Sequence, residues 1–244
     1  MRRQRIRAVL AVPAVAGFGA LLAWGFSGIP PFGRFHGFYG QLLNAVATPQ
    51  RHTTNVVTAV VFDYRGLDTM GEEFILFAAV VGVVLLLRAE RSRSRPVEDD
   101  VGSDAVRDFG IVMVGVTVLV GLWLAAFGIV TPGGGFQGGV AVAGGIVLVF
   151  LAAGYRSWRR IGRESFLDPF EGVGAGAYVV LGIAALVIQG FFLRNLLGPG
   201  RAGTLLSGGS MSLLNWAVAI EVTAANLVLF TEFLESYLRP YLSR

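Results

Sequence analysis

Long apolar runs separated by short polar or glycine-rich breaks dominate this chain of 244 residues. Six runs are long enough to cross a bilayer as helices, because about 20 apolar residues span the hydrocarbon core. We place these helices at about residues 8–26, 71–88, 108–130, 138–155, 169–192 and 213–238. A shorter run near residues 54–62 is too short to span and predicts a re-entrant or interfacial helix. The pattern predicts an all-α integral membrane protein.

The composition agrees with a membrane protein, since 54% of the residues are hydrophobic and only 15% are charged. Soluble domains carry about 25% charged residues. The chain has no cysteine, which excludes disulfides, thiolate chemistry and cysteine-based metal sites. Its two histidines, His36 and His52, lie in one polar connection and are expected on the surface. We therefore expect no bound metal and no cofactor.

The distribution of the arginines predicts the topology. With six spans, the basic clusters at residues 2–7, 88–95, 156–163 and 239–244 all fall on one side of the membrane. Basic loops are retained in the cytoplasm, so both termini are expected there. The net charge of +4 is thus explained by topology, and we expect no nucleic-acid partner.

A charged stretch divides the chain into two membrane modules. Residues 96–107 begin with a proline, continue with three acids and predict a solvated cytoplasmic linker. Residues 1–95 precede it with two predicted spans, and residues 108–244 follow it with four.

The glycine-rich break between the third and fourth spans is the most unusual stretch of the chain. It consists of Pro132, Gly133, Gly134, Gly135, Phe136, Gln137, Gly138 and Gly139. Its glycine spacing matches a dinucleotide fingerprint, but that motif requires a strand before it, and here an apolar helix precedes it. We interpret the break as a tight turn whose glycines allow helix backbones to approach closely.

Acids in the last predicted span form a first group of candidate functional residues. Glu221 lies well inside the span, where a carboxylate is costly and marks a functional site by default. Glu232 follows after 11 residues, about three turns, and so lies on nearly the same face. We expect Glu232 to be solvated near Arg239, whereas Glu221 either pairs with a polar group or carries a proton or cation.

A second group of acids surrounds the start of the second span, and consists of Asp63, Asp68, Glu72 and Glu73. Thr69 and Glu72 have the spacing of a capping box, which predicts a helix start there. Acids in a first helical turn can be purely structural, because they interact favourably with the helix dipole. Asp63 can also simply pair with Arg65. The density of carboxylates at a membrane entrance favours a role in ion movement.

Two stretches resemble known families. The run 132–139, between two helices, looks like the signature of the MnhB/MrpB family, the B subunits of multisubunit Mrp-type Na+/H+ antiporters. The resemblance covers roughly residues 104–244. Residues 55–72 are similar to the MbhE-like segment, which closes the large A subunit of Mrp antiporters or forms a small subunit of membrane-bound hydrogenases.

The resemblance implies a membrane subunit of an Mrp-type Na+(Li+)/H+ antiporter in a prokaryotic cell membrane. It implies Glu72 as the position of an acid associated with ion movement, and the glycines as packing elements. The expected partners are lipid and other antiporter subunits (A-, C-, D-, E-, F- and G-like). The transported ions would be H+ and Na+ (or Li+ or K+).

Two alternatives stay open. The first is an ion-translocating subunit of a membrane-bound hydrogenase or another redox pump related to complex I. The second is a purely structural scaffold between larger subunits. An enzyme is not expected, because the chain shows no nucleophile–base pair and no metal-ligand spacing.

Overall fold

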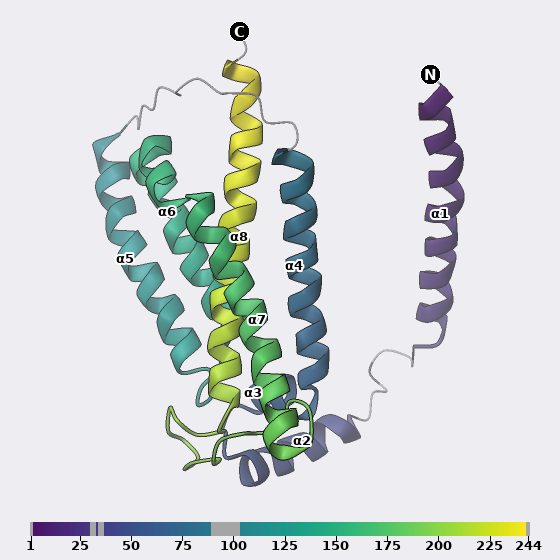
Figure 1. Cartoon of the computed structure of the whole chain (residues 1–244), viewed down its shortest axis with the longest axis vertical. Coiled ribbons are helices and arrows are strands. Elements are labelled where there is room, and N and C mark those ends of the chain that lie inside the picture. Colours follow the sequence, from purple (N-terminus) through teal and green to yellow (C-terminus); the bar gives the residue numbers. More distant parts are fainter. Residues whose placement is uncertain (1, 30–32, 34–36, 89–102, 243–244) are drawn as a thin grey trace. The chain divides into compact units, whose positions relative to one another are not determined.

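The structure is helical and contains no strand in the residues that it describes (Figure 1). It is a computed structural model that describes residues 2–29, 33, 37–88 and 103–242. The elements are, in chain order, α1 (Arg2–Ser27), α2 (Phe38–Arg51), α3 (Val56–Ala59), the π-helix η1 (Val60–Tyr64), α4 (Gly66–Arg88), α5 (Asp104–Ala126), α6 (Gly135–Ile161), α7 (Glu164–Gln189) and α8 (Met211–Leu242).

Five helices, α4 to α8, are long and apolar enough to cross a membrane. The apolar part of α1, Ala11–Ser27, is shorter than these spans. The all-α membrane fold class is therefore confirmed, while the sixth span and the side of the termini stay predictions.

The chain divides into two compact units, Met1–Leu42 and Leu43–Arg244. The first unit holds α1, a 26-residue helix that contains Pro13, and the first turn of α2. The second unit holds all five spans. Most of the predicted linker, residues 96–102, lies outside the described residues, as does His36. The division at that linker stays a prediction.

Two local predictions about the first half of the chain were wrong. Helix α4 begins at Gly66, three residues before the predicted capping box. Thr69 lies inside α4 and donates its hydroxyl hydrogen bond to the Val61 carbonyl at 2.6 Å, so it does not cap the helix. The stretch expected to be a polar connection contains helix α2, whose Gly40 and Pro49 conceal it in the sequence.

The short apolar run near residues 54–62 forms α3 and η1. Asn55 caps α3 by accepting a hydrogen bond from the Val57 amide at 3.1 Å. The chain then widens into the five-residue π-helix η1, which contains Asp63. Segments of π-helix are rare and occur frequently at functional sites.

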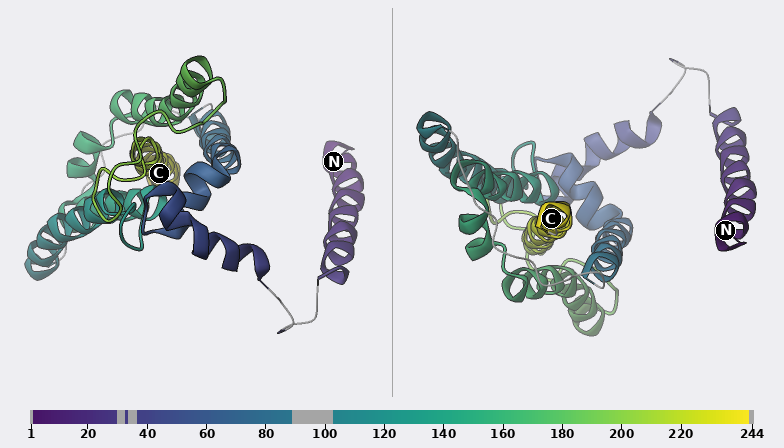
Figure 2. Two further views of the ribbon diagram at one scale, coloured as in Figure 1. Left: turned by 90° about the horizontal axis from the view of Figure 1, so that it is seen from below. Right: turned by 90° about the horizontal axis from the view of Figure 1, so that it is seen from above.

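Helix α8 is the centre of the second unit. It packs against α4, α5, α6, α7 and η1, and Figure 2 shows it surrounded by the other spans when viewed along its axis. It is also the most buried span, since 61% of its most apolar 18-residue stretch is buried inside the protein. In a bilayer, its neighbours shield most of this helix from lipid.

The glycine-rich break forms the joint between α5, α6 and α8. Gly133 and Gly134 have φ values of 150° and 144°, which residues with a Cβ rarely adopt. The Gly134 amide donates to the Leu124 carbonyl at 3.1 Å and so closes the turn after α5. The predicted tight turn is present.

The next glycines place α6 directly against its neighbours. The Gly135 amide donates to Asn215 Oδ1 at 2.7 Å, and a Cβ on Gly135 would collide with the Asn215 carbonyl. A Cβ on Gly138 would lie 2.7 Å from the Gly121 carbonyl oxygen of α5. The predicted close approach of helix backbones through the motif at 132–139 is therefore confirmed.

The segment before α3 binds the other side of the same joint. The Asn55 amide group donates to the Gly128 carbonyl at 2.7 Å and to the Thr131 carbonyl at 3.0 Å. Thr53 and Thr58 donate to the carbonyls of Ile129 and Gly128, at 2.5 and 2.6 Å. The carbonyl groups freed where α5 ends are thus satisfied by side chains from the N-terminal half of the chain.

We predict that Gly138→Ala destabilises the protein by about 1–3 kcal/mol, because the added methyl group overpacks the contact with α5. Gly144→Ala is the matched control, since Gly144 lies in the same helix, is exposed and has no atom near its Cβ position. Thermal unfolding in detergent measures the difference. Equal stability of the two variants would contradict the packing role.

Candidate functional site

The structure separates the predicted site residues into buried and exposed groups. Glu73, Glu221 and Glu232 are 1%, 0% and 1% exposed. Asp63 is half-buried, whereas Asp68 and Glu72 are exposed. The buried acids all lie on α4 and α8, so the candidate site is the contact between these helices and α7.

The inward face of α4 explains why Glu73 is buried and Glu72 is not. Gly66, Thr69, Glu73 and Val80 are the buried residues of α4, at the spacing of one helical face. Glu72 precedes Glu73 by one residue, which rotates its side chain by about 100° around the helix. It therefore lies on the outer surface of this chain.

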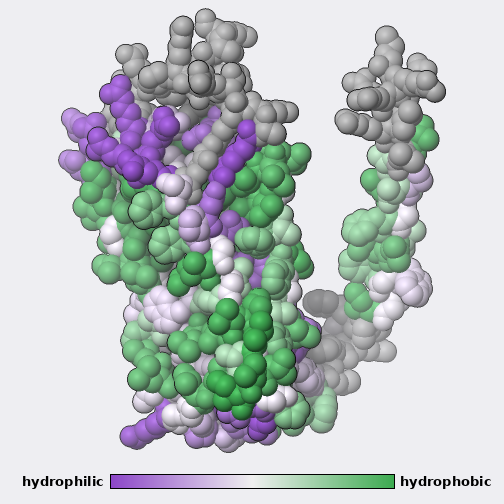
Figure 3. All heavy atoms as spheres, in the orientation of Figure 1, coloured by the Kyte–Doolittle hydropathy of each residue, from purple (hydrophilic) through white to green (hydrophobic). Residues whose placement is uncertain are grey.

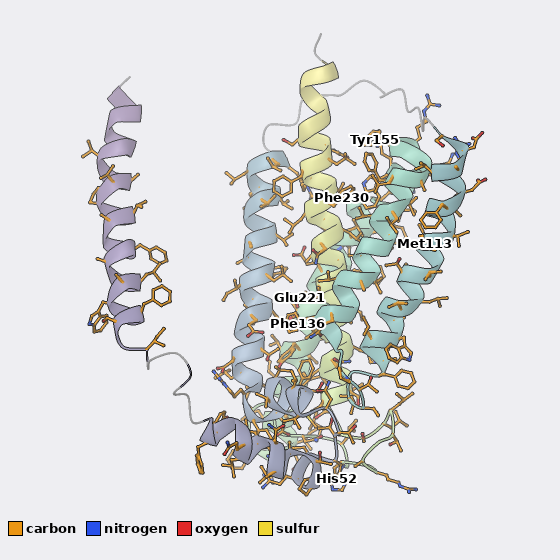
Figure 4. All side chains as sticks on the ribbon, turned by 180° about the vertical axis from the view of Figure 1, so that it is seen from behind. His52, Met113, Phe136, Tyr155, Glu221 and Phe230 are labelled. Carbon is orange, nitrogen blue, oxygen red and sulfur yellow. The ribbon has the colours of Figure 1, made fainter. Side chains whose placement is uncertain are left out.

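Glu73 and Glu221 form a buried pair of acids. Their carboxyl groups lie beside each other, and Glu72 is the next acid within electrostatic range of Glu73. No other described residue donates a hydrogen bond to their four oxygens, so the two groups can bond only to each other, through a shared proton. Figure 4 shows Glu221 near the middle of the bundle. Two carboxylates so close cannot both be ionised without a cation between them.

Gly174 of α7 brings a third helix against this pair. A Cβ on Gly174 would lie 2.5 Å from the Cβ of Glu221, so only glycine allows this approach. Glu171 lies one turn before Gly174 and is 4% exposed, and its Oε1 also lacks a hydrogen-bond partner among the described residues. It interacts electrostatically with Glu221 and with Asp168.

Sequence reasoning missed Glu171. With the helix placed from about residue 169, Glu171 falls in the first turn, where an acid is ordinary. Helix α7 begins earlier, at Glu164, so Glu171 lies two turns inside it. The signal that could have revealed it is the spacing of Asp168, Glu171 and Gly174, which places all three on one face.

Arg88 binds two acids at the far end of the same three helices. Its Nη1 and Nη2 donate to the two Asp168 carboxylate oxygens at 2.7 and 2.9 Å, and its Nε donates to Glu232 Oε1 at 2.7 Å. The expectation that Glu232 is solvated was wrong. Its carboxylate is buried because Arg88, 144 residues away in sequence, supplies the countercharge.

The acids at the start of α4 pair differently from the prediction. Asp63 pairs with Arg51 at 2.6 Å, and Arg65 pairs with Asp68 at 2.5 Å, so the alternative of an Asp63–Arg65 pair was wrong. Burial raises the pKa of the Asp63 carboxyl group above its ordinary value, although the Arg51 guanidinium opposes this. His52, in the preceding turn, contacts the Gly200 carbonyl through Nδ1 at 2.6 Å.

A depression of about 870 Å³ opens between these residues and the loop after α7. Asp63, Asp68 and Arg51 line it, together with Arg194. Tyr178 lies inward of it, where its hydroxyl donates to the Gly66 carbonyl at 2.9 Å and comes within electrostatic range of Glu73.

Polar groups therefore follow one line through the contact of α4, α7 and α8, which we call the acidic axis. It consists of Asp63 in the depression, Tyr178, the pair Glu73 and Glu221, Glu171, and the triad Arg88, Asp168 and Glu232. No cluster of three acids or histidines suited to a metal ion occurs in the part of the chain that the structure describes.

Buried acids along a bundle of apolar helices are typical of membrane proteins that move protons or ions. The family model for a domain related to the MnhB subunit of Na+/H+ antiporters matches residues 106–228, and the MbhE model, for the E component of MBH, matches residues 1–108. The chain belongs to the MnhB-related family and carries an MbhE module, which confirms the resemblance seen in the sequence.

Two relatives are similar to this chain. An uncharacterized protein of Methanocaldococcus jannaschii is 30% identical over 195 residues, which cover 70% of this chain and 73% of that protein. The probable A/B subunit of a K+/H+ antiporter of Rhizobium meliloti is 29% identical over 126 residues, or 42% of this chain and 13% of that one.

Two solved structures have the same fold. A chain of the membrane-bound sulfane sulfur reductase, an archaeal respiratory membrane complex, matches with a TM-score of 0.72 and 28% identity, covering 94% of this chain and 98% of that one. A chain of the Mrp complex from Dietzia sp. DQ12-45-1b matches with a TM-score of 0.69 and 25% identity. The match covers 93% of this chain and 26% of that one. The chain is a multi-pass membrane subunit of the antiporter type, a transporter component rather than an enzyme.

We predict that Arg88→Gln destabilises the protein by about 2 kcal/mol, because it removes the guanidinium that pairs with the buried Glu232 carboxylate. The expected loss is below that of a fully buried ion pair, since Arg88 is 25% exposed. The double variant Arg88→Gln with Glu232→Gln should recover part of the loss. Thermal unfolding measures this cycle, and additive losses would show that the pair does not interact.

Proposed function

We propose that this chain carries protons or cations along the acidic axis as one subunit of an Mrp-type Na+(Li+)/H+ antiporter. The observation that supports this function best is the buried pair of Glu73 and Glu221, whose oxygens have no partner but each other in the described residues. A membrane span retains such groups at a cost of several kcal/mol, and that cost is typical of sites that bind and release ions.

The depth of the pair suits an exchange site. Glu73 lies about 10 Å along α4 from its start, and Glu221 about 15 Å along α8 from its start. At this depth the pair holds a single negative charge, because water does not stabilise two. A proton that arrives displaces a bound cation, and a cation that arrives displaces the proton, which is the chemistry of antiport.

The two ends of the axis would serve as its entrances. Asp63 and Asp68 lie at the open depression, where they are paired with Arg51 and Arg65, so this end would be the water-filled entrance on one side. Glu171 leads from the pair to the triad at Arg88 on the other. There Arg88 pairs with both Asp168 and Glu232, and this triad would mark the other end of the path.

Glu72 fits a role in contact with a partner. It lies on the outer face of α4, where a neighbouring antiporter subunit would cover it. The same helix carries exposed apolar side chains such as Ile75 and Leu86, which are 72% and 73% exposed. Such side chains can contact lipid or another subunit. We infer that the path for Na+, Li+ or K+ includes residues of such partners.

The topology that we propose has six spans with both termini in the cytoplasm, α1 being the sixth. The ends of α4 and α6 and the starts of α5 and α7 lie at the same end of the second unit as the C-terminal end of α8 (Figure 1). This end carries Arg88 and the arginines of residues 156–163, in agreement with retention of basic clusters in the cytoplasm.

A redox-driven ion pump is the second candidate function. It is favoured by the fit to a single chain of the sulfane sulfur reductase complex over 98% of that chain. In that setting the acidic axis would have the same role, and electron transfer rather than an ion gradient would drive it. Purification of the native complex distinguishes the two, since redox subunits accompany the chain only in the second.

We expect Glu73→Gln and Glu221→Gln each to lower Na+-dependent proton exchange by about tenfold or more, as expected for loss of a proton-carrying group. The assay is fluorescence quenching in vesicles that contain the whole complex. Asp108→Asn is the matched control, because Asp108 is an exposed acid outside the axis. Normal exchange by both glutamate variants in an intact complex would contradict the ion-path role and favour a purely structural role for this chain.

The topology is tested with single cysteines, because the chain has none of its own. A membrane-impermeant maleimide should label Ser27→Cys and Arg201→Cys in intact cells, since both positions are predicted on the outer side. Ser103→Cys should react only after the cells are permeabilised. If Arg201→Cys is labelled in intact cells and Ser27→Cys is not, α1 does not cross the membrane.

A further inference from the structure

Helices α6 and α7 diverge from the short connection that joins them. Only Gly162 and Arg163 separate their ends, and each helix packs along α8. The two helices share almost no contact with each other. Part of the surface of α8 is therefore uncovered between them, although α8 is otherwise the most buried span.

An apolar groove of about 290 Å³ occupies this gap. Its walls are Val142 from α6, Leu167 and Phe170 from α7, and a floor of α8 residues that includes Trp216, Ile220 and Leu227. Phe170, Trp216 and Ile220 are 51%, 38% and 38% exposed. The groove follows α8 over 11 residues from Trp216 to Leu227, roughly 16 Å.

The groove offers no free polar group to an occupant. Thr223 is the only polar residue in its lining, and its hydroxyl lies 2.7 Å from the Ala219 carbonyl and 3.2 Å from the Gly139 carbonyl. An occupant of the groove itself must therefore be apolar along its length.

Basic side chains lie beside the end where α6 and α7 meet. Arg159 and Arg160 end α6, and Arg163 precedes α7. All three are exposed. Leu167, at the end of the groove, follows Arg163 by one turn, roughly 6 Å along the helix axis. Figure 3 shows hydrophilic side chains gathered at this end of the unit above an apolar band.

We propose that the groove binds one acyl chain of an anionic phospholipid, whose phosphate is held by Arg160 and Arg163. The lipid combines the two features that the surface requires: an apolar chain to fill the groove and a negative charge above it. Basic pockets between membrane helices recognise anionic headgroups by this combination. This site is separate from the acidic axis and does not depend on the proposed ion path.

The size of the groove favours an acyl chain over a partner helix. A helix is about 10 Å across, so a 16 Å length of it occupies on the order of 1,300 Å³. The groove holds about 290 Å³, so a helix would lie over it without filling it. A lipid acyl chain is thin enough to enter the groove. It would lie on α8 between α6 and α7 without displacing either helix.

The proposal is tested on the delipidated complex by native mass spectrometry with added phosphatidylglycerol or phosphatidylcholine. The unmodified complex should retain one phosphatidylglycerol for each copy of this chain, and no phosphatidylcholine at the same concentration. Arg160→Gln combined with Arg163→Gln should weaken phosphatidylglycerol binding about 30-fold, from a factor of about five for each arginine.

Two further variants complete the test. Arg194→Gln combined with Arg201→Gln removes the same charge from exposed positions in the loop after α7, at the other end of the second unit, and should leave lipid binding within about twofold, because electrostatic effects on lipid fall off within a Debye length. Ile220→Trp fills the groove from its exposed floor and should abolish retention of the lipid.

Three outcomes would overturn the proposal. The first is equal retention of the two lipids by the unmodified complex. The second is unchanged phosphatidylglycerol binding in the Arg160/Arg163 variant. The third is efficient crosslinking of Ile220→Cys to another subunit, which would identify the groove as a protein contact. Because no result needs ion transport, failure here is distinguishable from failure of the proposed function.

Discussion

The fold depends on the close approach of two helices to the backbone of α8. Gly135 of α6 and Gly174 of α7 contact α8 at Asn215 and Glu221, where a Cβ on either glycine would collide. In a bilayer, where lipid is as apolar as the side chains, such contacts and the hydrogen bonds they permit hold helices together. The same contacts exclude lipid and bulky side chains from the surroundings of Glu221.

This constraint also explains why the acids along the axis differ so much in their surroundings. At Arg88, a forked guanidinium reaches two carboxylates, so the buried Glu232 is compensated. At Glu73 and Glu221, the narrow contact between α4, α7 and α8 leaves no arginine within reach among the described residues. One end of the axis is therefore a stable ion pair, and the middle depends on an incoming proton or cation for its neutrality.

The sequence predicted the five spans of the second unit and the glycine joint, because long apolar runs and glycine spacing are local signals. It also identified Glu221, since an acid inside an apolar run stands out whatever its partners are. It did not show that Glu73 rather than Glu72 faces inward, because α4 is apolar on all sides and its pattern indicates no buried face. The pairing of Glu232 with Arg88 and the burial of Glu171 depend on contacts between distant segments, which no local pattern records.

The hydrogen bonds of Asn55 to the end of α5 have a consequence for how the protein is assembled. Two family models meet near residue 107, yet the carbonyl groups at residues 128–131 find their donors in residues 53–58. A polypeptide that carried the second half alone would expose these carbonyls at a helix end with nothing to satisfy them. The two halves are interdependent in folding, so a single chain guarantees equal amounts of both and brings each to the other as soon as it is made.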